Sequence, residues 1–404
     1  MTKFLFFNTP FHGHVNPALP IAQELVVRGA DLDYYLTDKF KQSIEAIGAV
    51  FHSISISLTN DTRAGSTLPL QIAEESCRIV PLLLEDIRAR QPDCVVYDIT
   101  CLWGRLFAQI LALPAVAIHF SYAVNVHTLR FASRQLAGNS PGKTAGPAPG
   151  GQQKALSSPE SLQKMHSVLE QLRLHYHLPP LDNFFMHAAA LNIVCIPRVF
   201  QPASESFDER FVFVGPSIQR QFTDTDFPFD LLDRQPLLYI SLGTVFNDRL
   251  AFYRQCFEAF GDQPWQVVLS IGEKVEQESL GPIPANFLVR SYVPQLEILQ
   301  RASIFLTHGG TNSVMEALYY SVPLVVLPGT FEHKVTGLRV VELGLGCLIE
   351  EGALTSQALR DAVAMVASDT TIRKNVEHMA HMLQNVGGSK QAADAIFQFV
   401  KKYQ

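Results

Sequence analysis

The sequence has few charged residues and no excess of positive charge. Asp, Glu, Lys and Arg make up 17% of the 404 residues, whereas 47% are hydrophobic. Lys and Arg number 32 against 38 Asp and Glu, so the formal net charge is −6. This composition supports a large core, and it excludes a global positive field that would hold a nucleic acid or an anionic membrane surface.

Long hydrophobic runs are also missing. The longest apolar region, residues 102–126, is interrupted by Arg105, Gln109, Pro114 and His119. It falls short of the roughly 20 clean residues that a transmembrane helix requires. The apolar run at the N-terminus is too short for a signal peptide. We therefore expect a cytoplasmic protein without a membrane span.

The sequence lacks the spacings that mark disulfide frameworks, metal centres and nicotinamide sites. The six cysteines include no CxxC pair, which predicts reduced thiols. Asp224 and Asp226 imitate the DxD motif of metal-dependent transferases, but they lie in a polar, aperiodic stretch, where a solvated turn is the simpler interpretation. No GxGxxG follows a strand, which argues against a dehydrogenase. We expect no metal and no other cofactor.

The chain does have a repeated alternation of strands and helices. An apolar run at residues 3–8 precedes a loop, and Asn16 and Pro17 then read as a helix cap and the first helical residue. That helix ends at Gly29, and another strand-like run follows. The pattern recurs over residues 92–121. These βαβ units predict a parallel sheet with helices on both faces.

The same rhythm restarts in the second half of the chain. Strand-like runs at residues 236–244 and 303–310 each end in a glycine turn, and a helical pattern follows each turn. We predict an α/β protein of two doubly wound, Rossmann-like parallel-sheet domains that face a cleft, with ligands at the carboxyl ends of the strands. The predicted parts are residues 1–213 for the N-terminal domain, 214–235 for a linker, 236–387 for the C-terminal domain, and about 388–404 for a helix that packs back on the first domain.

The strongest local signal is LTHGGTNSVMEAL at residues 306–318. An apolar strand ends at His308, two glycines allow a tight turn, and Asn312 or Ser313 can cap the helix that follows. The helix N-terminus then offers a phosphate site. Glu316, one turn further on, can accept hydrogen bonds from two adjacent hydroxyls, such as those of a ribose.

A second glycine turn also ends an apolar strand, at Ser241, Leu242, Gly243 and Thr244. Either turn alone is more often an ordinary connection between a strand and a helix. Both in one domain favour a site for a nucleoside diphosphate, because both can supply N–H and hydroxyl donors to the same phosphates.

The sequence FHGHVNP places His14 just before a predicted helix N-terminus. The positive end of that helix dipole disfavours an imidazolium, and a neutral histidine is a competent general base. Asp98 ends the strand CVVYD of the same predicted sheet, so it can orient His14. A histidine alone is more often a loop residue that bonds to backbone.

In these motifs the chain resembles a family 1 UDP-glycosyltransferase of the two-Rossmann GT-B fold, of the bacterial macrolide or natural-product type. The likeness runs essentially from end to end. The segments that carry it are GHVNP (13–17), VVYD (95–98), SLGT (241–244), YVPQLEIL (292–299), HGGTNSVMEAL (308–318), PLVVLPGTFEH (323–333) and ELGLG (342–346).

The resemblance implies a role for each matching residue. His14 would deprotonate the acceptor hydroxyl, and Asp98 would orient it. On the donor side, Tyr292 would stack on uracil and Gln295 would meet the edge of the base. The remaining implied contacts are Ser241, Gly243, Thr244, His308, Gly310, Asn312 and Ser313 for the diphosphate, Glu316 for the ribose, and Glu332 and His333 for the sugar.

Two positions depart from the family pattern. Tyr292 stands where the family often has Trp, and it should still stack. His333 stands in place of Gln, and in plant relatives a His here accompanies galactose instead of glucose. The resemblance implies transfer of glucose from UDP-glucose, with inversion and without a metal, to a hydroxyl of an apolar small molecule, giving a β-O-glycoside.

The acceptor pocket is expected in the first domain, near His14. The acceptor would be a macrolide, a flavonoid or another phenolic or terpenoid aglycone, and the protein would be a monomer or a weak homodimer. The predicted lining residues are Phe11, Phe120, Tyr122, Phe184, Phe185 and Met186. Alternative functions are transfer from UDP-galactose or a TDP-sugar, epimerisation of a sugar nucleotide, and nucleotide-sugar binding without catalysis.

Overall fold

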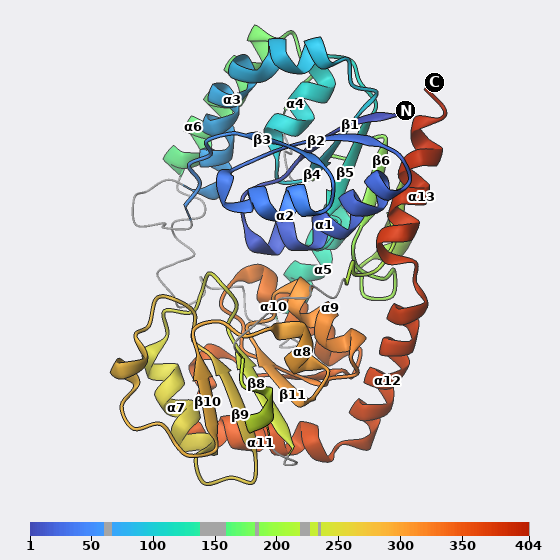
Figure 1. Ribbon diagram of the computed structural model, residues 1–404. Coiled ribbons are helices and arrows are strands. Elements are labelled where there is room, and N and C mark those ends of the chain that lie inside the picture. The colour runs from blue at the N-terminus through green and yellow to red at the C-terminus, as the bar shows by residue number, and fades with distance from the viewer. Residues whose placement is uncertain (60–66, 138–158, 182–185, 219–226, 233–235, 404) are drawn as a thin grey trace. The chain divides into compact units, whose positions relative to one another are not determined.

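The computed structural model describes residues 1–59, 67–137, 159–181, 186–218, 227–232 and 236–403. The chain divides into two compact units, one made of Met1–Ser217 with Gly387–Gln404 and the other of Ile218–Val386 (Figure 1). Asp224, Asp226, Phe184 and Phe185 lie outside the described residues. None of the described helices is both long enough and apolar enough to cross a membrane.

The first unit is built on a parallel sheet in the order β3-β2-β1-β4-β5-β6-β7. Its strands are β1 Lys3–Phe7, β2 Asp31–Leu36, β3 Val50–Ser53, β4 Cys94–Asp98, β5 Ala115–His119, β6 Leu191–Val194 and β7 Phe211–Phe213. Its helices are α1 His12–Val27, α2 Lys41–Ala46, α3 Leu68–Arg90, α4 Leu102–Ile110, α5 Val126–Ala137, α6 Pro159–His175 and α13 Gly388–Val400.

Helices cover both faces of this sheet, as Figure 1 shows. One core cluster joins the sheet to α1, α2 and α13, and another joins it to α3, α4 and α6. The central strands are therefore mostly apolar, and every residue of β4 is buried, including Asp98 at its end. On the second face, the ring of Phe7 stacks on Tyr35 and on Phe107, at centroid distances of 5.1 and 5.3 Å.

The last helix, α13, belongs to the first unit. Its residues Ala392, Ile396 and Phe399 are part of the core cluster that α1 also forms. Phe397 meets Phe4 edge to face at 5.7 Å, and Gly388 N donates a hydrogen bond of 2.9 Å to Val214 O. The C-terminal helix α13 thus packs, with α1, on one face of the sheet of the first unit.

The second unit repeats the architecture, with the parallel order β10-β9-β8-β11-β12-β13. Its strands are β8 Leu237–Ser241, β9 Gln266–Ser270, β10 Phe287–Arg290, β11 Ala302–Thr307, β12 Leu324–Val326 and β13 Gly346–Leu348. Its helices are α7 Leu250–Phe260, α8 Gln295–Leu299, α9 Thr311–Tyr319, α10 Phe331–Glu342, α11 Ser356–Ser368 and α12 Thr370–Asn385.

In both sheets the strand order reverses direction beside the first strand. This switch point lies between β1 and β4 in the first unit and between β8 and β11 in the second. Open α/β sheets bind ligands at the carboxyl ends of the strands that flank such a point. The prediction of two doubly wound parallel sheets is confirmed, and we expect the functional residues at the two switch points.

Two predicted helix starts are wrong in detail. Helix α1 begins at His12, so Asn16 is no cap and Pro17 lies inside the helix. Helix α9 begins at Thr311 after Gly310, whose backbone is extended, so Asn312 and Ser313 lie in the first turn and do not cap it. In both cases the residue before the helix, Phe11 or Gly310, makes no side-chain cap hydrogen bond, so side-chain capping preferences do not locate the start.

Candidate functional site

The switch point of the first unit brings His14 and Asp98 together. Asp98 is the last residue of β4, and His14 lies in the first turn of α1. His14 Nδ1 lies 2.8 Å from Asp98 Oδ2. The Asp98 side chain is 1% exposed, whereas that of His14 is 32% exposed. A buried carboxylate thus holds one ring nitrogen of a histidine whose ring reaches the surface.

Asp98 is stabilised as a carboxylate. Burial alone would raise its pKa, but the neighbouring His14 and hydrogen bonds from His14, Thr100 and Thr9 outweigh that effect and lower the pKa below its ordinary value. The charged carboxylate accepts the Nδ1 proton of His14, so Nε2 carries the lone pair. This tautomer is the one that a general base needs.

Aromatic residues flank His14, and two of them were predicted to line an acceptor pocket. The Phe11 and Phe120 rings lie 6.0 and 6.1 Å from the His14 ring, centroid to centroid. Tyr122 is buried and stacks on Phe200 at 6.1 Å. Met186 is half-buried, in the segment that leads to β6. Phe11 and Phe120 are therefore the predicted lining residues that contact the candidate base.

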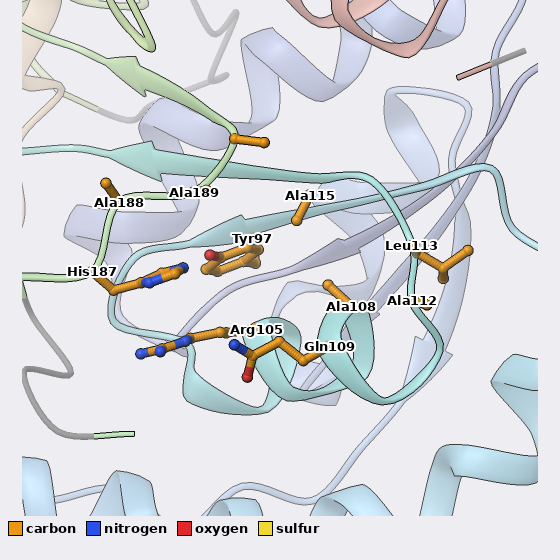
Figure 2. Close-up of a pocket in the computed structure, with 11 residues that line it drawn as sticks. Tyr97, Arg105, Ala108, Gln109, Ala112, Leu113, Ala115, His187, Ala188 and Ala189 are labelled. Carbon is orange, nitrogen blue, oxygen red and sulfur yellow. The ribbon is translucent and has the colours of Figure 1, made fainter. Parts of the chain in front are cut away.

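A separate cavity of about 300 Å³ lies beside α4 (Figure 2). It is lined by Tyr97, Arg105, Ala108, Gln109, Ala112, Leu113, Ala115, His187, Ala188, Ala189 and Ala190. Of the predicted acceptor residues that the structure describes, none is among them. No sequence motif predicted this cavity, and His14 does not line it.

In the second unit, the two glycine turns lie side by side at the switch point. Strands β8 and β11 pair so that Ser241 faces Thr307, and each strand runs directly into its turn. Gly243 and Gly309 adopt positive φ angles of 74° and 89°, which favour glycine. The backbone can therefore turn sharply at both strand ends.

His308 fills the space between these turns. A Cβ on Gly243 would lie 2.7 Å from His308 Cε1, and a Cβ on Gly310 would lie 2.5 Å from His308 Nε2. Burial, together with the neighbouring His333, lowers the pKa of His308 to about 3, although a hydrogen bond to the Ser241 backbone opposes the shift. The ring is therefore neutral at pH 7.

The α9 N-terminus follows the second turn directly. Helix α9 starts at Thr311, and the predicted donors Asn312 and Ser313 are half-buried in its first turn. A helix N-terminus directs N–H groups and the positive end of its dipole outward, where they attract a phosphate. Thr244, in the first turn, is exposed, whereas Ser241 is buried and accepts a hydrogen bond from Gly243 N at 3.3 Å.

Gln295 and Glu316 form one network. Tyr239 Oη donates to Gln295 Oε1 at 3.0 Å, and Gln295 Nε2 donates to Glu316 Oε2 and to Ser313 Oγ, the latter at 3.3 Å. Burial raises the pKa of Glu316 to about 7, although the Gln295 hydrogen bond lowers it. Tyr239 was not predicted, because a tyrosine inside a buried strand reads as core.

The residues predicted for the base and the sugar differ in exposure. The Tyr292 side chain is 70% exposed, so its ring can serve as a stacking surface. Glu332 is exposed, whereas His333 is 9% exposed and meets His308 edge to face at 4.6 Å. Thr330 Oγ1 caps α10 by accepting from His333 N at 3.2 Å. His333 Nδ1 has no hydrogen-bond partner among the described residues.

No group of three or more His, Cys, Asp or Glu side chains that could hold a metal ion occurs in the described part of the chain. All six cysteines are free, and Cys94, Cys101, Cys195 and Cys256 are buried. Burial raises the pKa of each of these four thiols.

The comparisons with known proteins agree with this arrangement. Residues 254–386 match the family model described as Erythromycin biosynthesis protein CIII-like, C-terminal domain. The chain is 37% identical to the NDP-glycosyltransferase YjiC of Bacillus subtilis, over 98% of this chain and 96% of the relative. It is 34% identical to YojK of the same organism, named an uncharacterized UDP-glucosyltransferase, over 100% of this chain and 98% of the relative.

A solved structure shows the same likeness. The crystal structure of CalG4, the calicheamicin glycosyltransferase, matches with a TM-score of 0.81 and 31% identity, over 100% of this chain and 99% of that one. The identity and coverage together exceed what a shared fold alone would give. The chain therefore belongs to the natural-product glycosyltransferases of the GT-B fold, as its similarity to YjiC and CalG4 shows.

Proposed function

We propose that the protein transfers a sugar from a nucleoside diphosphate sugar, with UDP-glucose as the first choice, to a hydroxyl group of an apolar small molecule. The observation that carries the proposal is the His14–Asp98 pair at 2.8 Å. The acceptor would be a macrolide, a flavonoid or another phenolic or terpenoid aglycone, held beside Phe11 and Phe120. The free thiols suit a reducing compartment, and we expect the protein in the cytoplasm.

The chemistry follows from the state of each group. The acceptor O–H proton would pass to His14 Nε2 while the acceptor oxygen forms a bond to the anomeric carbon of the sugar. The bond between that carbon and the diphosphate breaks, and its electron pair stays on the diphosphate. Attack opposite the leaving group inverts the anomeric centre, so an α-linked donor gives a β-O-glycoside.

The second unit would hold the donor. The α9 N-terminus and the turns at Gly243 and Gly309 would receive the developing negative charge of the diphosphate, so we expect no requirement for a metal. Glu316 would accept from the ribose hydroxyls, with Gln295 beside it, and Tyr292 would stack on the base. Glu332 and His333 would contact the sugar.

The name NDP-glycosyltransferase of the relative YjiC leaves the base open, whereas that of YojK specifies UDP-glucose. The test is a panel of UDP-glucose, UDP-galactose, UDP-GlcNAc and TDP-glucose, crossed with phenolic and macrolide acceptors and read by mass spectrometry. Efficient glucosylation from UDP-glucose supports the donor assignment, and preference for UDP-galactose or TDP-glucose overturns it. Conversion of a nucleotide sugar without any acceptor would contradict transfer itself.

Two further measurements test the mechanism. The proton coupling at the anomeric carbon of the product should be that of a β-glycoside, and an α-product would rule out inversion. EDTA should leave turnover unchanged, whereas strong inhibition that manganese or magnesium reverses would contradict a metal-free reaction.

A further inference from the structure

Two consecutive residues after β1 hold the His14–Asp98 pair: Asn8 bonds to the backbone of His14, and Thr9 bonds to the carboxylate of Asp98. Asn8 Nδ2 donates to the backbone oxygen of His14 at 3.2 Å, and Tyr34 Oη donates to Asn8 Oδ1 at 2.7 Å. Thr9 Oγ1 donates to Asp98 Oδ2 at 2.7 Å. Asn8, Thr9 and Tyr34 are all 0% exposed. Neither Asn8 nor Thr9 belongs to a motif that the sequence singled out.

The hydroxyl of Thr9 belongs to a directed chain of hydrogen bonds. Thr9 Oγ1 lies 3.1 Å from Thr100 Oγ1. A hydroxyl has one proton, and that of Thr9 goes to Asp98, so Thr100 must donate to Thr9. The order is therefore Thr100 to Thr9 to Asp98, and Asp98 in turn accepts from His14.

These contacts fix both oxygens of the Asp98 carboxylate. Oδ1 accepts from Thr100 N at 2.9 Å. Oδ2 accepts from Thr9 Oγ1 and also lies 2.8 Å from His14 Nδ1. A buried carboxylate needs its hydrogen bonds to remain charged. The oxygen that orients the base is thus the same oxygen that Thr9 holds.

Other titratable groups surround Asp98 but do not replace Thr9. The charge of Asp98 acts on Tyr34, Cys101, His119 and Cys195, which are all buried. Burial raises the pKa of the tyrosine and of both thiols, and it lowers the pKa of His119 to about 4. These four groups are therefore neutral at pH 7, and none of them holds a charge that varies near neutral pH.

We propose that Thr9 is a positioning residue for His14: its buried hydroxyl fixes the Asp98 oxygen that holds Nδ1 and thereby aims Nε2 at the acceptor. Thr9 touches neither reacting atom. The proposal rests on the function proposed above, in which His14 is the base. Asn8 supports the same alignment through the backbone of α1.

The test compares Thr9→Val, which keeps the shape but loses the hydroxyl, with Thr9→Ser, which keeps the hydroxyl. Thr9→Val should lower kcat about tenfold and leave the KM for the donor unchanged. The valine keeps the backbone N–H that lies 3.4 Å from Asp98 Oδ2 but loses the hydroxyl. More negative charge then remains on Oδ2 and stabilises the protonated base, so the acidic limb of the kcat/KM profile should move to higher pH. Thr9→Ser should restore kcat and the profile.

A second experiment separates positioning from a general effect on folding. If Thr9 acts through Asp98, Thr9→Val should cause no further loss of kcat in an Asp98→Ala background. A further tenfold loss there would overturn the proposal. Should Thr9→Val fail to fold, Thr100→Val removes the upstream donor and must move the acidic limb in the same direction by a smaller amount; an unchanged profile contradicts the proposal.

The two proposals fail in different ways. If His14→Ala retains full turnover, the assignment of the base is wrong. If His14→Ala is inactive while Thr9→Val matches the unaltered protein in kcat and in pH profile, only the role of Thr9 is wrong.

Discussion

Glu316 is a half-buried carboxyl group whose pKa is raised to about 7, chiefly by burial. The folded protein keeps this proton at pH values where the unfolded chain, with an ordinary glutamate, has lost it. Folding is therefore disfavoured increasingly as pH rises from about 4.5 to 7. Above that range the cost is constant.

Replacement of Glu316 by Gln should remove this pH dependence. The difference in melting temperature, variant minus unaltered protein, should grow between pH 5 and pH 8, because the variant has no charge to bury. Thermal unfolding at several pH values measures this difference, and the titrations of all other groups cancel in it. A difference that stays constant with pH would show that Glu316 has an ordinary pKa.

For individual residues, the sequence predicted the pair His14 and Asp98 but not the residues that hydrogen-bond to predicted site residues. His14 and Asp98 were predicted because Asp98 ends a strand and His14 stands near the start of the helix that follows the neighbouring strand. The pairing of β1 with β4 brings the two residues together. Thr9 and Tyr239 could not be predicted, because a threonine in a loop and a tyrosine in a buried strand have no spacing that marks them. Their roles depend on hydrogen bonds that form only in the folded protein, from Thr9 to Asp98 and from Tyr239 to Gln295.

Among the elements, the two glycine turns beside His308 leave no room for a side chain at Gly243 or Gly310. Gly243 has a positive φ, and a Cβ on either Gly243 or Gly310 would overlap the His308 ring. The ring cannot retreat easily, because His333 packs against it at 4.6 Å.

Gly243→Ala and Gly310→Ala should each weaken UDP binding and destabilise the second unit by about 1–3 kcal/mol. Gly352→Ala is the matched control, since its φ is not positive and no atom lies within 4 Å of the added carbon. Calorimetric titration with UDP and denaturant unfolding measure the two effects. If Gly243→Ala and Gly310→Ala bind UDP as the control does, the turns do not hold the diphosphate.

The elements themselves were largely predictable, and their exact starts were not. Continuous apolar runs predicted the buried strands, and helical spacing predicted the helices between them. The start of α1 was placed too late because Pro17 resembled a first helical residue, whereas the helix begins at His12 and includes Pro17 and Pro20.

Over the whole molecule, each of the two units contains one of the chain's two tryptophans. Trp103 is buried in the first unit, and Trp265 lies in the second. The C-terminal helix α13 contributes Ile396, which is 0% exposed, to the core of the first unit. The fluorescence of each tryptophan can therefore report on its own unit.

In a Trp265→Phe background, Ile396→Ala should lower the unfolding free energy reported by Trp103 by about 2–5 kcal/mol, because it leaves a cavity under α13. Arg28→Ala, which removes the partly exposed ion pair with Asp394, should cost less than about 1 kcal/mol. Equal effects of the two substitutions would mean that α13 is not part of this core.

The most direct measurement of the proposed function is turnover by His14→Ala. Loss of the general base should lower kcat by a factor of about 10²–10⁴, while the affinity for UDP stays unchanged, because the residues assigned to UDP lie in the second unit. His166→Ala, an exposed histidine on α6, is the control and should keep full activity. Undiminished glycosyl transfer by His14→Ala would contradict the assignment of His14 as the base.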